Sequence, residues 1–404
     1  MCLVYTLGVD SPVCRRELAL KVKPKVMAIY GTRPEVIKLA PVINKLCQSE
    51  HLDVCAVSTG QHREMLNQAA GWFGLKHDYS LQLMAVGQSL NSLVARIISE
   101  VGTLIEAEKP DLVLVQGDTS SAMAAALAAF NSGVKVVHLE AGLRTGDLNS
   151  PFPEEGNRKI ISQLASLHLA PTFSGKVNLL REGIDERAVK VIGNTVIDAL
   201  LSVSELPVSF DDPSIQHLLE SGQQFVLVTS HRRENIAVMG EIAQSILELS
   251  KRFPKTVFLL PLHLNPEVRQ VMVPKLSGRP NILITQPQEY PQFALLMREA
   301  DLVLTDSGGV QEEAPTFGKP VLVMRTTSER EEGLKTGAVR LVGTSVSNIV
   351  SSVSNVLNAK EMSAAPGRSV NPYGDGRSAG RAVGAIEAFL GLGEPIKEFE
   401  SPLD

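Results

Sequence analysis

Short apolar runs alternate with amphipathic segments along most of this 404-residue chain. A first set of such runs predicts β-strands at residues 26–30, 54–58, 112–115, 134–137, 167–170 and 189–192. Between the second and third of these, residues 90–105 carry their apolar side chains at helical spacing along one face. Strands that alternate with helices in this way predict a parallel sheet with helices on its faces.

The alternation stops once and then restarts, which predicts two domains. Residues 206–213 hold turn formers without periodicity, so we place the linker near residues 193–213. A second set of strands follows at residues 225–229, 257–260, 282–284, 302–304, 321–323 and 339–342. We therefore predict an α/β protein with two facing, Rossmann-like, doubly wound domains, residues 24–195 and 196–378. Residues 379–404 form a C-terminal helical segment that could cross back to the first domain.

Composition narrows the class of protein. The chain is 44% hydrophobic and 21% charged, as in globular proteins with an ample core. Its net charge of -5, without a strongly basic block, argues against nucleic acid as a partner. No apolar run has the length of a membrane span, so we expect no membrane association.

The N-terminal part of the chain carries no clear processing signal. All four cysteines lie before residue 56 and include no CxxC pair, so we expect reduced thiols, a cytoplasmic location and no metal site. Residues 1–23 do not have the charge order of a secretory signal. We expect a disordered extension there, with a transit peptide as the alternative.

The densest candidate chemistry lies in residues 138–158, which combine four carboxylates with Arg144 and Arg158. Glu140 directly follows a predicted strand, and the carboxyl ends of strands are where open α/β sheets bind ligands. Glu154 and Glu155 begin a predicted helix, where they could serve only as favourable charges at its N-terminus. Carboxylates crowded with arginines favour a site in which one acid is a base and another a proton donor.

Residues 305–313 predict a site for a pyrophosphate group. A strand ends there, Gly308 and Gly309 expose backbone N–H groups, and a helix begins at once. Ser307 could cap this helix and donate to a phosphate, and Glu313 could bind ribose hydroxyl groups. The alternative is an ordinary glycine turn with a serine cap.

Two further strand ends carry candidate ligand contacts. Arg33 and Lys38 begin a helix after a single-glycine turn, which is neither a dinucleotide fingerprint nor a Walker loop. They could hold phosphate or simply form a solvated face. His231 lies beside two arginines, which disfavour its protonation and suit it to hydrogen bonding or base catalysis. A surface basic cluster is the alternative, and His263 supports the same idea less strongly.

Taken together, nine segments occur in one order over residues 24–343: GTRPEVIK, TGQHREM, GDTSSA, HLEAGLRTGDLNSPFPEEGNR, SHRREN, PLHLNP, PQEY, TDSGGVQEEAP and TTSER. The chain resembles the non-hydrolysing UDP-N-acetylglucosamine 2-epimerases. The resemblance implies a fold like that of the GT-B glycosyltransferases and a homodimer. It also implies interconversion of UDP-GlcNAc and UDP-ManNAc without a cofactor or metal.

The resemblance also assigns roles to individual residues. It places Asp118, Glu140, Glu154 and His231 in catalysis around the sugar. It gives substrate contacts to Arg33, Lys38, Arg158, Gln288, Phe293, Ser307, Gly308, Gly309, Glu313 and Arg330, and contacts to a second bound nucleotide sugar to Gln61, Arg63 and His263. Thr326 and Glu331 stand where the family pattern has Asp and Pro, which loosens the loop that carries Arg330.

The implied chemistry is loss of UDP from C1 with removal of the C2 proton, giving 2-acetamidoglucal, followed by re-addition of UDP. It requires a base, an acid and a clamp for the departed UDP, and Asp118, Glu140 and Glu154 are all eligible as the base. Three rival functions stay open: a hydrolysing enzyme that releases UDP and ManNAc, a glycosyltransferase, and a non-catalytic sensor of sugar nucleotides.

Overall fold

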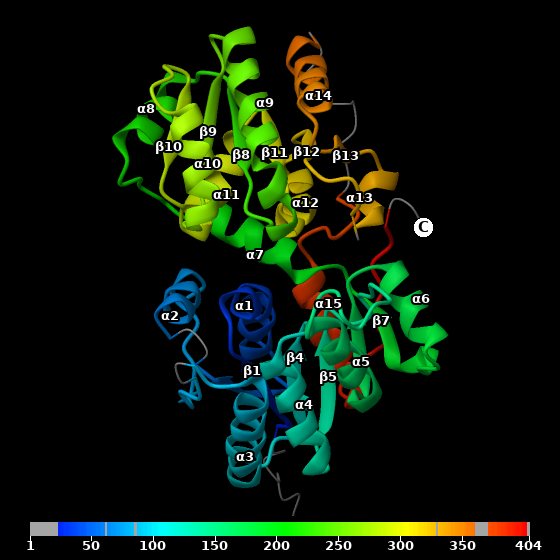
Figure 1. The fold of residues 1–404 in the computed structure, drawn as a ribbon. Helices are drawn as coiled ribbons and strands as arrows, with labels where there is room; N and C mark the ends of the chain where they lie inside the picture. Colours follow the sequence, from blue (N-terminus) through cyan, green and yellow to red (C-terminus); the bar gives the residue numbers. More distant parts are fainter. Residues whose placement is uncertain (1–22, 61–62, 85–86, 329, 360–370, 402–404) are drawn as a thin grey trace, which may run out of the picture.

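Two stacked α/β units make up the molecule (Figure 1). The structure is a computed structural model that describes residues 23–60, 63–84, 87–328, 330–359 and 371–401. The extension predicted for residues 1–23 lies outside these ranges except for its last residue. Among the described helices, none is both long and apolar enough to cross a membrane.

The first sheet has seven described strands in the order β3-β2-β1-β4-β5-β6-β7, and all neighbouring pairs are parallel. Its strands are β1 (Lys25–Tyr30), β2 (Asp53–Ser58), β3 (Tyr79–Ser80), β4 (Leu112–Gln116), β5 (Lys135–Leu139), β6 (Leu167–Ala170) and β7 (Val189–Val191). Its helices are α1 (Arg33–Cys47), α2 (Arg63–Trp72), α3 (Leu90–Glu108), α4 (Ser120–Asn131), α5 (Glu154–Leu164) and α6 (Phe173–Arg181), with a 3-10 turn at Glu186–Ala188.

Strand β1 shows why these runs are apolar throughout. Val26, Ala28 and Tyr30 point to one face and join a core cluster that includes residues of α1. Met27 and Ile29 point to the other face and join a cluster with α3 and α4. A strand covered on both faces needs apolar side chains at every position rather than at alternate ones.

The second sheet has six described strands, all parallel, in the order β10-β9-β8-β11-β12-β13. Its strands are β8 (Phe225–Thr229), β9 (Val257–Pro261), β10 (Ile282–Thr285), β11 (Leu302–Thr305), β12 (Val321–Val323) and β13 (Val339–Leu341). Its helices are α8 (Pro213–Ser221), α9 (Met239–Arg252), α10 (Pro266–Leu276), α11 (Tyr290–Glu299), α12 (Gly308–Glu313), α13 (Glu331–Lys335) and α14 (Val346–Asn358), with 3-10 turns at Arg233–Val238 and Ala314–Phe317.

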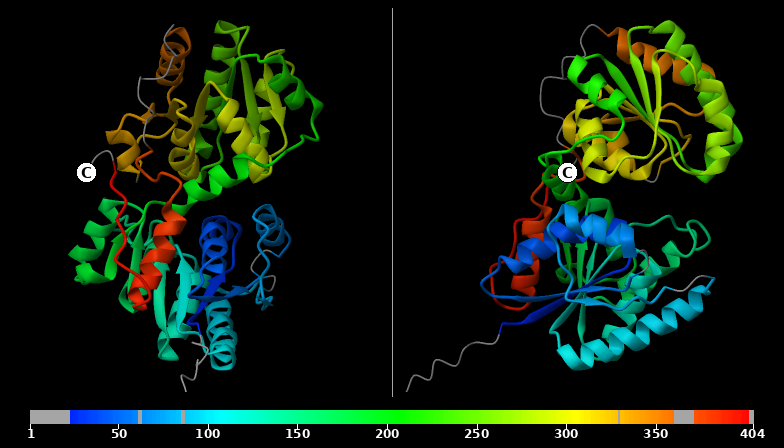
Figure 2. Two further views of the ribbon diagram at one scale, coloured as in Figure 1. Left: turned by 180° about the vertical axis from the view of Figure 1, so that it is seen from behind. Right: turned by 90° about the vertical axis from the view of Figure 1, so that its left-hand side faces the viewer.

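Helices α7 (Thr195–Ser204) and α15 (Ser378–Phe389) connect the two units (Figure 1). Helix α7 leaves the first sheet and packs against both α1 and α11. Helix α15 follows the second sheet in sequence but packs against α1 and β6 of the first, as both views in Figure 2 also show. Beyond α15, the backbone N–H of Phe399 donates to the carbonyl of Val191 in β7 at 2.8 Å. The chain therefore returns to the first unit at its end.

Candidate active site

A cavity of about 220 Å³ lies between the two units, next to the carboxyl ends of β1, β4 and β5. The strand order of the first sheet reverses between β1 and β4, which is where doubly wound sheets bind ligands. Five residues singled out from the sequence line this cavity: Lys38, Asp118, Glu140, Arg158 and Arg330. The first four come from the first unit and Arg330 comes from the second.

Glu140 is fixed by side chains on both of its carboxyl oxygens. It follows β5 with a φ of 64°, a left-handed conformation that few residues other than glycine adopt. Nζ of Lys38 lies 2.5 Å from one oxygen, and the amide of Gln116 donates to the other. Burial raises the pKa of the Glu140 carboxyl, while Lys38 opposes this effect.

Lys38 keeps its charge in this environment. Burial disfavours the charged form of Lys38, but attraction to Glu140 and Glu312 outweighs it, and the pKa of the lysine is raised. Within one site, burial thus raises the pKa of the Glu140 carboxyl group, and neighbouring carboxylates raise the pKa of Lys38.

Asp118 belongs to a second charged group. Arg158 on α5 donates from Nε to Asp118 at 2.8 Å and pairs through Nη1 with Glu155 at 3.0 Å. Glu155 also accepts from the backbone N–H groups of Thr145 and Gly146. Burial would raise the pKa of Glu155, but these hydrogen bonds outweigh it, so that the pKa is lowered. Glu155 therefore orients Arg158, and Arg158 in turn holds the carboxylate of Asp118 at the cavity.

Glu154 is the first residue of α5, one turn before Arg158. Within the described part of the chain, its Oε2 atom is buried without a hydrogen-bond partner. Buried polar atoms are nearly always paired, so such an oxygen is suited to a group that the protein itself does not supply.

Arginine side chains crowd the glycine turn after β11. A β-carbon built on Gly308 would stand 2.7 Å from Cζ of Arg330 and 2.9 Å from Nη2 of Arg232. Nε of Arg330 also donates to Glu312 at 2.7 Å. Only glycine lets two guanidinium groups approach the backbone this closely, which creates a positively charged surface for an anion.

Asp306 organises the loop that carries His231. This carboxylate is fully buried and accepts from Ser230 Oγ at 2.9 Å and from the backbone N–H of His231 at 3.1 Å. The ring of His231 stacks on that of His263, with centroids 5.6 Å apart. Burial lowers the pKa of His231, and Asp306 opposes this effect. His231 is thus favoured in its neutral form.

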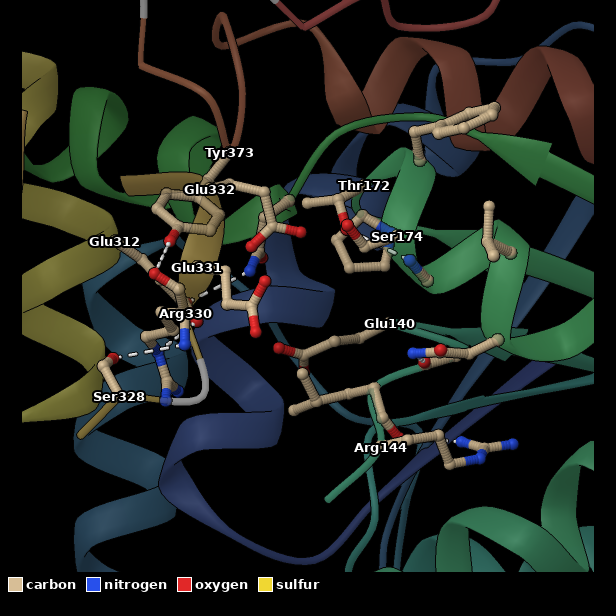
Figure 3. Close-up of a pocket in the computed structure, with 18 of the residues that line it drawn as sticks. Glu140, Arg144, Thr172, Ser174, Glu312, Ser328, Arg330, Glu331, Glu332 and Tyr373 are labelled. Carbon is tan, nitrogen blue, oxygen red and sulfur yellow. Dashed lines mark hydrogen bonds and ion pairs between the residues drawn. The ribbon is translucent and has the colours of Figure 1, made fainter. Parts of the chain in front are cut away.

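A larger cavity of about 660 Å³ adjoins the first and shares Glu140 and Arg330 with it. Figure 3 shows it between side chains of the first unit, such as Arg144, and side chains of the second, such as Glu332. Arg144 is held by Glu182, to which Nη2 donates at 2.7 Å, and this contact lowers the pKa of Glu182 to about 2.

Comparison with known proteins decides the family. A family model described as UDP-N-acetylglucosamine 2-epimerase matches residues 44–387. The UDP-N-acetylglucosamine 2-epimerase of Escherichia coli (strain K12) is 42% identical over 369 residues, which cover 90% of this chain and 98% of that protein. The chain belongs to the UDP-N-acetylglucosamine 2-epimerase family.

Solved structures agree with this membership. The UDP-GlcNAc 2-epimerase from Neisseria meningitidis, in a crystal structure bound to UDP-GlcNAc, aligns with a TM-score of 0.79 at 43% identity, covering 91% of this chain and 100% of that one. The lipopolysaccharide outer core galactosyltransferase WaaB aligns with a TM-score of 0.55 at 14% identity, covering 90% and 99%. The latter match shows a shared fold only, and it confirms the predicted GT-B-like architecture.

Several residues singled out from the epimerase resemblance lie away from the two cavities. Arg33 is exposed at the start of α1. Gln288 donates to the carbonyl of Gln286 at 2.7 Å, and Phe293 is partly buried on α11. Ser307 occupies the N-cap position of α12, but its side chain makes no capping hydrogen bond. The predicted second-site residue Gln61 and the side chain of Arg63 lie outside the described parts of the chain.

Residues that were not singled out from the sequence also contact this epimerase-family site, among them Gln116, Asp306, Glu312 and Tyr290, whose hydroxyl donates to Glu313. Asp306 and Glu312 lie inside the glycine-turn motif, which marked the segment without indicating what their carboxylates contact. Gln116 ends a strand and Tyr290 begins a helix, and neither residue type there signals a contact to a carboxylate. These contacts depend on tertiary packing.

Proposed function

We propose that this protein epimerises UDP-GlcNAc at C2 to UDP-ManNAc, reversibly and without hydrolysis. The observation that carries the proposal is the lining of the interdomain cavity, where Lys38, Asp118, Glu140 and Arg158 face Arg330. Membership of the 2-epimerase family supports it, as does the complex of the Neisseria meningitidis relative with UDP-GlcNAc.

The reaction that suits these groups is elimination followed by addition. The C2 proton of the sugar has no adjacent ketone, so that direct removal is difficult. Departure of UDP from C1 with loss of the C2 proton gives 2-acetamidoglucal, in which C1 and C2 are joined by a double bond. UDP then adds back to C1, and C2 is protonated from the opposite face. A base is needed on one face of the sugar to remove the C2 proton, and an acid is needed on the other face to return one.

We propose that Asp118, Glu140 and Glu154 supply the acid and the base. Burial raises the pKa of Glu140 above its ordinary value, and a carboxyl group perturbed in this way inside a cavity is a candidate for proton transfer. Two further acceptors are the unpaired buried oxygen of Glu154 on α5 and the carboxylate of Asp118, which pairs with Arg158 of the same helix. His231, whose lowered pKa favours the neutral imidazole, would contact the sugar or the departing phosphate.

The UDP clamp is proposed to consist of Ser307, Gly308, Gly309 and Arg330 of the second unit, together with Arg33 at the start of α1. Two guanidinium groups lie over Gly308, so that a diphosphate could be held while its bond to C1 is broken. Retaining UDP in this way separates epimerisation from hydrolysis, because the intermediate can be captured again before it leaves.

The test is incubation of the purified protein with UDP-GlcNAc as the only substrate in deuterium oxide, followed by NMR of the products. We expect UDP-ManNAc with deuterium at C2, since the abstracted proton exchanges with solvent. Free ManNAc and UDP as the main products would show a hydrolysing enzyme, and an unchanged substrate would favour a sensor. UDP-ManNAc that is wholly protiated at C2 would exclude this elimination.

The family resemblance also supports a homodimer. Light scattering on the protein eluting from a gel-filtration column would show a mass near twice the chain mass of 43.6 kDa.

A further inference from the structure

A buried tyrosine is bonded to the carboxyl group that the family resemblance assigns to the ribose. The hydroxyl of Tyr290, at the start of α11, donates to Oε1 of Glu313, at the end of α12, at 2.7 Å. Both side chains are buried. Burial raises the pKa of Tyr290 well above its ordinary value, so that the hydroxyl keeps its proton and acts as the donor. One of the two oxygens of Glu313 is thus already taken by the protein.

The other oxygen of Glu313 lies towards the glycine turn. A β-carbon built on Gly309 would stand 4.0 Å from Oε2 of Glu313. The last torsion of a glutamate side chain is intrinsically broad, and a hydrogen bond to one oxygen restricts it. Tyr290 therefore directs the second oxygen to the side of the turn on which the nucleotide is proposed to bind.

The facing domain packs on this tyrosine. Trp72, the last residue of α2 and the single tryptophan of the sequence, has its ring centroid 6.1 Å from that of Tyr290, at an interplanar angle of 34°. One turn earlier on α2, the amide of Gln68 donates to Glu289, the neighbour of Tyr290. The position of the Tyr290 ring is consequently set by both domains.

We infer that Tyr290 is a positioning residue for the contact between Glu313 and the ribose of the bound nucleotide, and that Trp72 holds it in place from the first domain. The inference rests on the proposed function in that the ligand is a uridine nucleotide. It adds a residue that need not touch the substrate itself.

The protonation of Glu313 makes this role measurable. Burial raises the pKa of Glu313 to about 7, the hydrogen bond from Tyr290 lowers it, Glu312 raises it and Lys38 lowers it. Tyr290, Glu312 and Lys38 are thus titratable groups whose proximity shifts the pKa of Glu313. An ionised carboxylate can accept hydrogen bonds from ribose hydroxyls, so that the ribose contact strengthens as pH rises through the pKa. Loss of the Tyr290 hydroxyl should raise the pKa of Glu313, so that the strengthening of the ribose contact occurs at higher pH.

The experiment compares UDP with 2′-deoxy-UDP by calorimetry across the neutral pH range, in the full-length protein and in Tyr290→Phe. This variant keeps the ring that packs on Trp72. At neutral pH we expect UDP to bind roughly tenfold more weakly, the scale of one hydrogen bond to a charged group. The loss for 2′-deoxy-UDP should be smaller. Because both ligands carry the same diphosphate, its titration cancels in the ratio of the UDP affinity to the 2′-deoxy-UDP affinity. The pH midpoint of this ratio should be higher in Tyr290→Phe than in the wild type.

Two further variants serve as controls. Tyr79→Phe removes another tyrosine–glutamate hydrogen bond, that of Tyr79 to Glu108, far from the cleft on β3, and should behave as the wild type. Glu313→Gln cannot ionise and should make the ratio independent of pH. Tryptophan emission gives a second readout, because a ligand that engages Glu313 should alter the surroundings of Trp72 through Tyr290.

The outcomes separate the inference from the proposed function. If Tyr290→Phe retains the wild-type ratio and pH midpoint, or loses both ligands equally at every pH, then Tyr290 is merely a packing residue and the inference is wrong. Epimerisation by the wild-type protein would be unaffected by that result. A wild-type protein that binds no UDP would overturn the inference and the proposed function together.

Discussion

The three carboxylates proposed to surround the sugar have different partners. Asp118 pairs with Arg158, Glu140 is bonded to Lys38 and Gln116, and Glu154 has a buried oxygen without a partner among the described residues. A carboxylate fixed by two side chains suits a defined direction of proton transfer, whereas one with an open acceptor suits a substrate hydroxyl. The three carboxylates would therefore meet the sugar in different environments.

Asp118→Asn, Glu140→Gln and Glu154→Gln should each lower kcat by at least about two decades, the usual scale for a positioned acid or base. Each change removes a proton-transfer group while keeping its shape. Product formation followed by NMR gives kcat, and calorimetry with UDP checks that the nucleotide still binds. Asp147→Asn, in the exposed loop before Pro151, should remain close to the wild type. Full turnover in all three carboxylate variants would refute their assignment.

The UDP clamp gives a second prediction for single residues. Arg330→Ala and Arg33→Ala should each weaken UDP binding by about 1.5–3 kcal/mol, because each removes a charge-assisted contact to an anion. Calorimetry measures the change, with Arg187→Ala as a control, since Arg187 is exposed and pairs with Asp185 away from the cleft. Unchanged affinity in both clamp variants would place the nucleotide elsewhere.

Site residues could be predicted from the sequence only where they belong to a motif that directly follows a predicted strand. Lys38, Asp118, Glu140 and Arg158 line one cavity because the segments that carry them follow the carboxyl ends of β1, β4 and β5, while their functional roles stay predictions. The contact between Lys38 and Glu140 was not predicted, since it joins positions far apart in the sequence. The role assigned to Lys38, a nucleotide contact, stays a prediction.

At the scale of elements, the loop after β5 packs directly on the first turn of α6. Gly142 has a φ of 93°, and a β-carbon there would stand 2.2 Å from the carbonyl oxygen of Gly175. The nearest atoms belong to the backbone of Gly175, which cannot relieve a clash by changing a side-chain rotamer. This contact fixes the loop that begins with Glu140.

Gly142→Ala should therefore lower the thermal midpoint, with a cost of about 1–3 kcal/mol or more from the strained φ and the clash. It should also lower turnover, because Glu140 would shift with its loop. Gly71→Ala is the matched control: Gly71 lies within α2, and a β-carbon there meets no atom within 4 Å. Alanine in a helix is expected to stabilise by about 0.5–1 kcal/mol. Equal midpoints for both variants would contradict the role given to the Gly142 contact.

The predicted strands match the observed ones closely, because strands buried on both faces leave continuous apolar runs. Some described elements were not predicted, among them β3 and α7. Strand β3 has only two residues, both exposed, and so leaves no pattern. Helix α7 lies inside the stretch interpreted as a linker, although residues 195–204 are apolar and largely buried. The turn formers at residues 206–213, which follow α7, caused the predicted linker to include this helix.

At the scale of the molecule, α15 completes the first core although it follows the second sheet in sequence. Ala382, Val383 and Ile386 belong to the same buried cluster as Val26 and Leu112. Helix α15 therefore packs on the first unit, while the division of the chain into domains stays a prediction. No periodicity could have shown which surface the helix covers, because that choice depends on where the chain lies after α14.

Ile386→Ala should lower the stability of the first domain by about 2–5 kcal/mol, the usual cost of emptying a buried isoleucine site. Hydrogen exchange should locate the effect at α1 and β6, which α15 contacts, rather than in the second sheet. Ile160→Ala is the control, because Ile160 on α5 is exposed and its loss leaves no cavity. Exchange that rises equally in both domains would show that α15 stabilises the molecule as a whole.

The return of α15 also has a consequence for the order in which the protein is made. A ribosome releases the first sheet and its helices well before residues 378–389, which cover part of that sheet's core. The second domain has all its strands by β13, so its core can close while the surface that awaits α15 is still open. The half of the polypeptide that is synthesised first is therefore the last to be finished.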